Sequence, residues 1–131
     1  ELGGFKIPGV REKVITTLFA DDTTIYLNEY DEYEVLEKIL LTWCKASGAR
    51  FNIDKTEILP IGTKEYRDWL ITNRTNHETN AKLPENIKIA IDGEPCRSLG
   101  GWVGNLKDDV VIWAKNVEKI KAHLKRWNRS H

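Results

Sequence analysis

The chain has 131 residues, a length that corresponds to one domain or to part of one. Hydrophobic residues make up 40% and charged residues 31%, as in an ordinary globular protein, and 20 basic side chains balance 20 acidic ones. Because there is no bulk positive charge, any contact with nucleic acid must come from local basic patches. The longest uninterrupted apolar run, residues 110–114, is too short to span a membrane, and no secretory signal opens the chain.

The sequence contains no methionine and two isolated cysteines, Cys44 and Cys96. Without a methionine, Glu1 is not a natural start of translation, so we expect an excerpt of a longer protein or a processed piece. The cysteines form no CxxC pair, which predicts free thiols in a reducing compartment; a disulfide between them is the alternative. We therefore expect an intracellular protein, nuclear or cytoplasmic, that is neither secreted nor bound to a membrane.

The first elements predicted are an irregular lead-in and a β-hairpin. Residues 1–10 carry Gly or Pro at four positions, which predicts irregular backbone. Two β-prone runs, residues 14–19 and 23–27, flank the short polar segment Ala20-Asp21-Asp22. Such a pattern predicts an antiparallel hairpin with the aspartates at its turn.

A helix is predicted over residues 32–47. Asp31, followed three residues later by Glu34, is an Asx version of the capping box. Gly48 stands where a glycine in the left-handed conformation commonly ends a helix. Apolar residues recur at helical spacing between these two signals. They are Val35, Leu36, Ile39, Leu40 and Trp43.

The middle of the chain predicts short strands, a short helix and a loop. Residues 51–53 and 57–61 are strand candidates, and Thr63 is placed to cap a short helix that carries an aromatic face. Residues 72–86 are polar almost throughout and predict a long exposed loop.

A second hairpin is predicted near the end of the chain. Residues 87–91 alternate between apolar and polar, Asp92-Gly93 is a strong turn signal, and residues 96–103 form the return strand. Gly100-Gly101 predicts a bulge or a close backbone approach in that strand.

The most periodic segment is the last one. Six apolar residues step by 3, 4, 3, 4 and 3, and this predicts a helix with one narrow apolar stripe: Val110, Trp113, Val117, Ile120, Leu124 and Trp127. Basic residues occupy the remaining circumference: Lys115, Lys119, Lys121, Lys125, Arg126 and Arg129. Such a face could follow a phosphate backbone, but a solvated amphipathic helix has the same pattern.

These elements predict an α+β fold. The first hairpin and a strand near Phe51 or Ile58 should form a small antiparallel sheet that packs on the helix of residues 32–47. The buried set is expected to be Leu36, Leu40, Trp43, Phe51 and Ile58. Replacing a buried Trp43 by Ala would cost roughly 3–5 kcal/mol.

Asp21 and Asp22 are the sharpest chemical feature of the sequence. Neighbouring acids on a strand point to opposite faces, but at a tight turn both carboxylates can face one point. A hard divalent cation such as Mg²⁺ would relieve their repulsion, and two such ions can assist phosphoryl transfer. Because Asp is also common in ordinary turns, the doublet by itself leaves both readings open.

The residues around the doublet resemble the reverse transcriptases of non-LTR, LINE-type retrotransposons. Phe19-Ala20-Asp21-Asp22 between two β-prone runs resembles their catalytic hairpin, and residues 46–57 resemble the segment that follows it, with Ser-Gly, then Asn, then Lys-Thr. Residues 97–104 resemble the hairpin that grips the primer, and the terminal helix falls where their thumb begins. The sequence of residues 5–9, Phe-Lys-Ile-Pro-Gly, looks most like that of fungal LINE-type elements.

The resemblance implies specific catalytic roles. Asp21 and Asp22 would be metal-binding carboxylates of a polymerase palm, and the ion, Mg²⁺ or Mn²⁺, is expected only in the full-length enzyme. Lys55 would lie by the phosphates of the incoming nucleotide and could protonate the leaving pyrophosphate. An ordinary solvated lysine beside Asp54 is the alternative.

The resemblance also implies contacts with an RNA template and a DNA primer in the full-length enzyme. Leu99, Gly100 and Trp102 would shape the primer grip, with plain hairpin packing as the alternative. Separately from the resemblance, the helix cations Lys115, Lys119, Lys121, Lys125 and Arg126 are candidates for contact with nucleic acid, with plain solvation of the helix as the alternative.

The implied fold is a partial palm followed by a second hairpin and a thumb-like helix. It divides into residues 1–62, 63–106 and 107–131 within one compact unit. The family uses a third carboxylate on an earlier strand, and only 20 residues precede Asp21, so that strand and the fingers are missing here. We therefore expect no polymerase activity from this chain alone.

Without the earlier strand, one edge of the Asp-Asp hairpin has no partner. This exposed edge and the apolar stripe predict a homodimer, by edge pairing, by swapping or through the stripe. Two alternatives to an excerpt of a polymerase stay open. One is a non-catalytic scaffold, derived from such an enzyme, that binds nucleic acid or protein; the other is an inert structural fragment.

Overall fold

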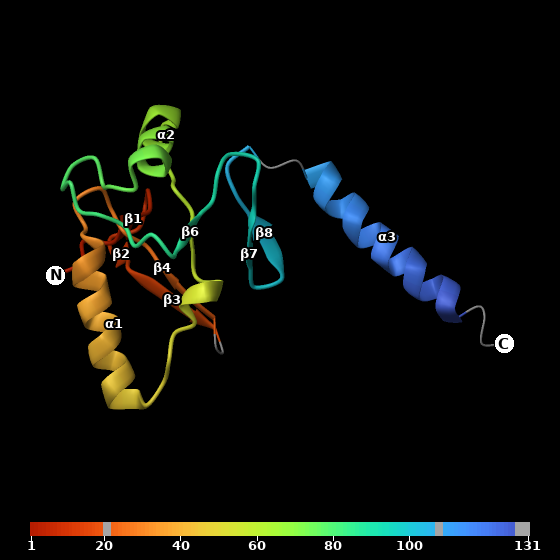
Figure 1. Cartoon of the computed structure of the whole chain (residues 1–131), viewed down its shortest axis with the longest axis horizontal. Helices are drawn as coiled ribbons and strands as arrows, with labels where there is room; N and C mark the ends of the chain where they lie inside the picture. The colour runs from red at the N-terminus through yellow and green to blue at the C-terminus, as the bar shows by residue number, and fades with distance from the viewer. Residues whose placement is uncertain (20–21, 107–108, 128–131) are drawn as a thin grey trace.

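The computed structural model describes residues 1–19, 22–106 and 109–127 (Figure 1). These residues form a mixed fold with three α-helices, one 3-10 helix and four two-stranded sheets, which confirms the α+β class. The helices are α1 (Tyr33–Ser47), η1 (Ile53–Lys55), α2 (Lys64–Asn73) and α3 (Asp109–Trp127). The strands are β1 (Phe5–Lys6), β2 (Lys13–Val14), β3 (Thr16–Phe19), β4 (Asp22–Ile25), β5 (Glu57–Ile58), β6 (Lys88–Ile89), β7 (Cys96–Ser98) and β8 (Gly101–Val103).

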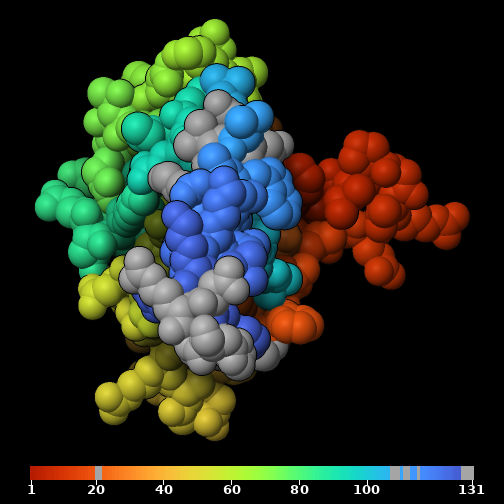
Figure 2. Space-filling model, turned by 90° about the vertical axis from the view of Figure 1, so that its right-hand side faces the viewer, coloured from red at the N-terminus to blue at the C-terminus, as the bar shows by residue number. Residues whose placement is uncertain are grey.

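The N-terminal residues form a small hairpin, so the predicted irregular lead-in is interrupted by a short strand at Phe5–Lys6. β1 and β2 pair antiparallel, and the N–H of Val10 donates to the carbonyl of Ile7 across Pro8-Gly9. Pro followed by Gly at the centre of a turn is the signature of a type II turn, and this signal could have predicted the hairpin. Figure 2 shows the N-terminal residues, in red, projecting to one side of the molecule.

The hairpin predicted around the aspartate pair is confirmed. β3 and β4 pair antiparallel from Thr16–Ile25 to Phe19–Asp22. The N–H of Tyr26 donates to the carbonyl of Ile15 at 2.8 Å and continues the pairing by one step. β3–β4 forms a sheet of its own, so the predicted pairing of this hairpin with a strand near Phe51 or Ile58 was wrong.

Helix α1 begins and ends close to where the sequence predicts, but Asp31 does not cap it. Glu32 is the N-cap residue and no side chain bonds there, while Gly48 ends the helix with its N–H on the carbonyl of Cys44. The Asp31 carboxylate instead accepts the backbone N–H groups of Gly3, Gly4 and Asn28 at 2.6, 3.0 and 2.9 Å.

The approach of the N-terminal backbone to Asp31 depends on Gly4. This residue has φ +67°, and a Cβ there would lie 2.7 Å from Cγ1 of Ile15 and 2.8 Å from the carbonyl oxygen of Val14. Only glycine fits both the backbone conformation and the space.

The segment after α1 is not a strand. Asn52 accepts the N–H of Lys55 on its side chain and thereby caps η1, which replaces the strand predicted over residues 51–53. Local side-chain bonding of this kind competes with extended structure. β5, at Glu57–Ile58, is the short remnant of the second strand candidate, and it pairs in parallel with β6.

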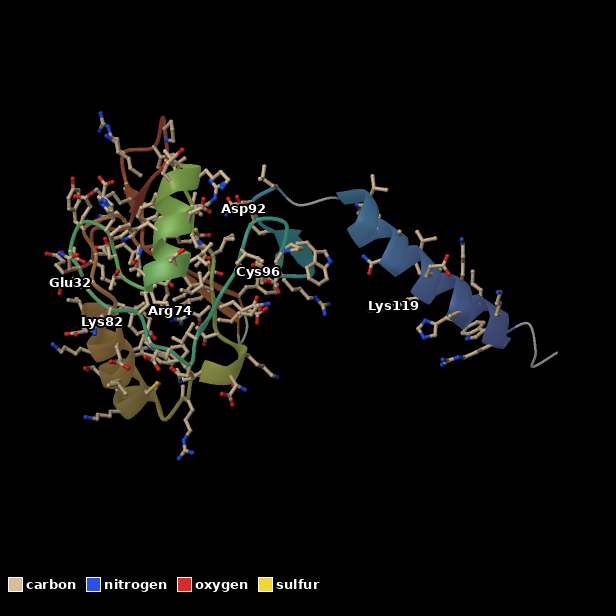
Figure 3. The ribbon with its side chains drawn as sticks, turned by 45° about the horizontal axis from the view of Figure 1, so that its top comes forward. Glu32, Arg74, Lys82, Asp92, Cys96 and Lys119 are labelled. Carbon is tan, nitrogen blue, oxygen red and sulfur yellow. The ribbon has the colours of Figure 1, made fainter. Side chains whose placement is uncertain are left out.

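Helix α2 is capped as predicted, since the Thr63 hydroxyl accepts the N–H of Tyr66. The polar segment after it is less exposed than predicted. Asn76 is buried and donates to the carbonyl of Asp31 at 3.3 Å. Arg74 donates to the carbonyls of Pro84 and Ile87 and so ties the loop to the sheet (Figure 3).

The second hairpin is shorter than predicted and uses other strands. β7 pairs with β8 across Leu99-Gly100, and β6 takes no part because it pairs with β5. Asp92-Gly93 does form a turn, with the N–H of Glu94 on the carbonyl of Ile91, but this turn only redirects the chain.

The core draws its buried apolar side chains from α1, α2 and the segment around β6. Its buried apolar members are Leu36, Leu70, Ile87, Ile89 and Ala90. Of the side chains expected to be buried, only Leu36 belongs to it. Trp43 lies near the end of α1 and is 48% exposed, and its ring centroid lies 5.4 Å from that of Phe51.

Helix α3 is confirmed with the predicted extent, and it extends away from the other elements (Figure 1). The boundaries predicted between the three chain segments stay predictions.

Candidate functional site

The end of the β3–β4 hairpin is the candidate metal centre. Phe19 and Asp22 are register partners, so only two residues connect the strands. Asp22 is therefore the first residue of β4, and its side chain is exposed. Asp21, the other predicted ligand, lies outside the described residues.

The hairpin holds Asp22 by backbone pairing along its whole length. Four register pairs join the strands, and the Thr16 hydroxyl adds a bond to the carbonyl of Thr24 at 3.2 Å. Leu18 and Phe19, beside the turn, are exposed apolar side chains. The arrangement presents one exposed carboxylate at the start of β4 in a short β ribbon.

Asp22 has the right donor type for a hard cation but not a complete set of ligands. Its carboxylate makes no hydrogen bond or ion pair with the described residues, so its oxygens are available. Mg²⁺ is bound in proteins by such oxygens together with water and substrate phosphates. Among residues 1–19, 22–106 and 109–127, however, no three His, Cys, Asp or Glu side chains are grouped to hold a metal ion.

Lys55, the predicted phosphate-binding residue, is the last residue of η1 and its side chain is exposed. Its backbone N–H is fixed by the Asn52 side chain at 3.3 Å, which sets where the lysine leaves the chain. No hydrogen bond or ion pair joins Lys55 to Asp22, so the described contacts do not bring the two residues together.

The predicted primer-grip residues lie together on the β7–β8 hairpin. Leu99 and Gly100 are the two turn residues, both with positive φ, and Trp102 follows on β8 as the register partner of Arg97. The Leu99 and Trp102 side chains are exposed. This turn is therefore accessible. Its exposure fits both alternatives, a primer grip and an ordinary surface hairpin.

Ion pairs and a hydrogen bond connect the residues that flank this hairpin to the region of β5 and β6. These contacts were not predicted from the sequence. Lys88 bridges Glu57 and Glu94 at 3.3 and 2.6 Å, and Asn105 donates to the carbonyl of Pro60 at 2.6 Å. Burial, followed by the hydrogen bond to Glu57, raises the pKa of Cys96 to about 11. A thiol with that pKa stays protonated at neutral pH, so Cys96 is not suited to be a nucleophile.

A second anchor joins α2 to the turn before the hairpin. The Arg67 guanidinium donates to both oxygens of Asp92, with Nε–Oδ1 at 2.9 Å and Nη2–Oδ2 at 2.8 Å. The hydrogen bond from Arg67 lowers the pKa of Asp92 below its usual range. Figure 3 shows Asp92, which precedes the hairpin, and Cys96, the first residue of β7, on the same side of the molecule.

The basic residues predicted to contact nucleic acid lie on α3. Lys119, Lys121, Lys125 and Arg126 have exposed side chains, and Lys121 also pairs with Glu118 at 3.1 Å. Lys115 is within the helix, but its side chain is outside the description. Figure 1 shows α3 extending away from the β3–β4 hairpin.

Comparisons with protein-family models, with curated proteins and with solved structures give no match to this chain. Of the helices that the structure describes, none combines the length and apolar character that crossing a bilayer requires.

Proposed function

We propose that this chain is the part of an RNA-directed DNA polymerase that carries the Asp-Asp hairpin, the primer-grip hairpin and the start of the thumb. The supporting observation is the tight β3–β4 hairpin, whose register places Asp22 at the first position of β4 beside a two-residue connection. In this assignment Asp21 and Asp22 are two ligands of the catalytic Mg²⁺ or Mn²⁺ ions.

The order of the elements supports the same assignment. After the hairpin come α1, then η1 with Lys55, then the β7–β8 hairpin with Leu99, Gly100 and Trp102, then the long helix α3. Lys55 is assigned to the nucleotide phosphates and the β7–β8 turn to the primer strand.

The residues of this chain supply only part of the metal site of such a polymerase. Asp22 supplies an available carboxylate, and the paired strands hold it at one place relative to the hairpin. The bound cations would stabilise the charge that develops on the attacking and leaving oxygens. Since the described residues offer no third acidic ligand, the 131-residue chain is expected not to incorporate deoxynucleotides on a primed RNA template.

A hairpin graft tests the proposal. Residues 16–25 replace the Asp-Asp hairpin of an active LINE-type reverse transcriptase, and primer extension is measured with Mg²⁺. We expect the chimera to extend the primer, and Asp22→Asn to reduce the rate by about 100-fold or more because a metal ligand is lost.

The matched control is Thr24→Asn, which adds the same amide on the same face of β4, two positions further on. This variant should keep most of the activity. A chimera that is folded and binds primer–template, but that extends no primer, would contradict the proposal.

A further inference from the structure

Helix α3 carries a continuous exposed apolar stripe. Its six members are Val110, Trp113, Val117, Ile120, Leu124 and Trp127, and their exposed fractions run from 43% to 78%. Figure 1 shows the helix extending away from the remaining elements, and Figure 2 shows it, in blue, in front of them. Contiguous apolar surface of this kind marks an interaction site.

We propose that α3 is a dimerisation helix, which pairs with α3 of a second copy of this chain as an antiparallel two-stranded coiled coil. The spacing of the stripe alternates between three and four residues along the helix. An average of 3.5 residues keeps one seam facing a partner helix, which is the pattern of the a and d positions of a heptad.

Side-chain size favours the antiparallel register. When Val117 of one copy faces Ile120 of the other, Trp113 faces Leu124 and Val110 faces Trp127. Each tryptophan then meets a smaller side chain. In a parallel pair, Trp113 and Trp127 would each meet their own copy, and two large rings would crowd one layer of the seam.

A shallow depression lies along the stripe on the surface of α3. It is open and mainly apolar, and its lining consists of Val110, Trp113, Ala114, Val117, Glu118 and Lys121. Four of these, at positions 110, 113, 114 and 117, surround one hole of a knobs-into-holes seam. In the antiparallel register this hole receives Leu124 of the second copy.

The charges along α3 favour the same orientation. Asp109 begins the helix, and Lys125 and Arg126 lie in its last turn. An antiparallel pair brings the acidic start of each helix beside the basic end of the other, and it opposes the two helix dipoles. A parallel pair would bring like charges together at both ends.

The area is sufficient for a reversible dimer. Trp113 and Trp127 are 66% and 78% exposed. At ~150–250 Å² for a full aromatic side chain, the four tryptophans of a dimer contribute roughly 400–700 Å². The eight aliphatic stripe residues bring the total toward the ~1,000 Å² that a specific interface needs. We therefore expect a dimer that dissociates on dilution.

Sedimentation equilibrium of the whole chain tests the dimer. The average mass should rise with concentration from 15.1 kDa toward twice that value. Ile120→Glu should raise the dissociation constant by at least about 100-fold, because it buries an unpaired charge in the seam. Ala122→Glu adds the same carboxylate outside the stripe and should change the constant by less than about threefold.

Two results would overturn the proposal at this stage. One is the mass of a single chain at every concentration, which would leave the stripe to another protein or to nucleic acid. The other is a dimer that Ile120→Glu does not weaken, which would point to pairing of strand edges. Circular dichroism of each variant confirms that the helix is retained.

Disulfide trapping tests the orientation in a background with Cys44→Ser and Cys96→Ser. A chain with Val110→Cys is mixed with a chain with Trp127→Cys in a thiol–disulfide buffer. We expect the mixture to cross-link, and Val110→Cys alone not to, because the antiparallel register separates the two copies of position 110 by about 25 Å. Efficient cross-linking of Val110→Cys alone would show a parallel pair and overturn the register.

Discussion

Asp31 connects the N-terminal residues to the start of α1. Burial by itself would raise the pKa of this carboxyl, but the N–H groups of Gly3, Asn28 and Gly4 hold it below the ordinary 3.8. Hydrogen bonds to a charged acceptor are about twice as strong as neutral ones. Asp31 is therefore a structural carboxylate and not a candidate for catalysis.

Replacing Asp31 by Asn should lower the free energy of unfolding by about 1–3 kcal/mol at pH 7, because the backbone donors lose their charged acceptor. A group with a depressed folded pKa contributes stability above its unfolded pKa and loses it as the pH falls. The difference between wild type and Asp31→Asn, measured by urea unfolding, should hence shrink below about pH 3.8. A difference that is the same at pH 7 and pH 3 would contradict this role.

The role of Asp31 shows what a local pattern can and cannot predict. An acid just before a helix fits a cap, and the sequence around it favours that interpretation. The donors that it actually binds include Gly3 and Gly4, far away in the chain. Nothing in the spacing of residues 28–34 indicates that this distant backbone arrives there.

At the scale of elements, helices were predicted better than strand partners. The bounds of α1 and α3 and the start of α2 follow from periodicity and from caps such as Thr63 and Gly48, which are local signals, whereas α2 continues to Asn73, into the segment predicted as a loop. Strand pairing depends on contacts between distant segments. The parallel pairing of β5 with β6 therefore gave no local signal, and the turn at Asp92-Gly93 predicted a hairpin that does not form.

The β7–β8 turn contains a residue that does not suit it. Leu99 has φ +48° and Gly100 has φ +83°, as a two-residue type I′ turn requires. Leu99→Asn should raise the free energy of unfolding by about 1 kcal/mol, because Asn tolerates the left-handed conformation. Thermal unfolding measures this, with Leu99→Ala as the control that should bring no gain of that size. A less stable Leu99→Asn variant would show that the Leu99 side chain has packing contacts that matter more than strain.

At the scale of the molecule, the core is built from buried side chains of α1, α2 and the segment around β6. Ile87 is only 1% exposed, whereas Trp43 is 48% exposed. The helical period assigned Trp43 to the inner face of α1, but it could not predict that this residue stays about half exposed near the end of the helix.

This exposure reverses the expected order of two truncations. Ile87→Ala should cost about 2–5 kcal/mol, and Trp43→Ala, with half of its ring already in water, about 1–2 kcal/mol. Urea unfolding of the two variants measures the order directly. A larger loss for Trp43→Ala would mean that the end of α1 is covered in solution.

The candidate site was predictable only in part. The strand pattern around the doublet predicted the hairpin, and the structure confirms that hairpin with Asp22 at the start of β4. The positions of Lys55 and of the β7–β8 turn relative to Asp22 depend on the tertiary packing, and no spacing in the sequence defines them. The function assigned to these residues stays a proposal.

Ligation of Mg²⁺ by Asp22 is tested most directly in the chimeric polymerase with Asp22→Cys. The substitution exchanges a hard oxygen ligand for a soft sulfur ligand. Primer extension with Mg²⁺ should fall by about 100-fold or more, and thiophilic Cd²⁺ or Mn²⁺ should restore part of it. Full activity of the Asp22→Cys chimera with Mg²⁺ would contradict a role for Asp22 as a metal ligand.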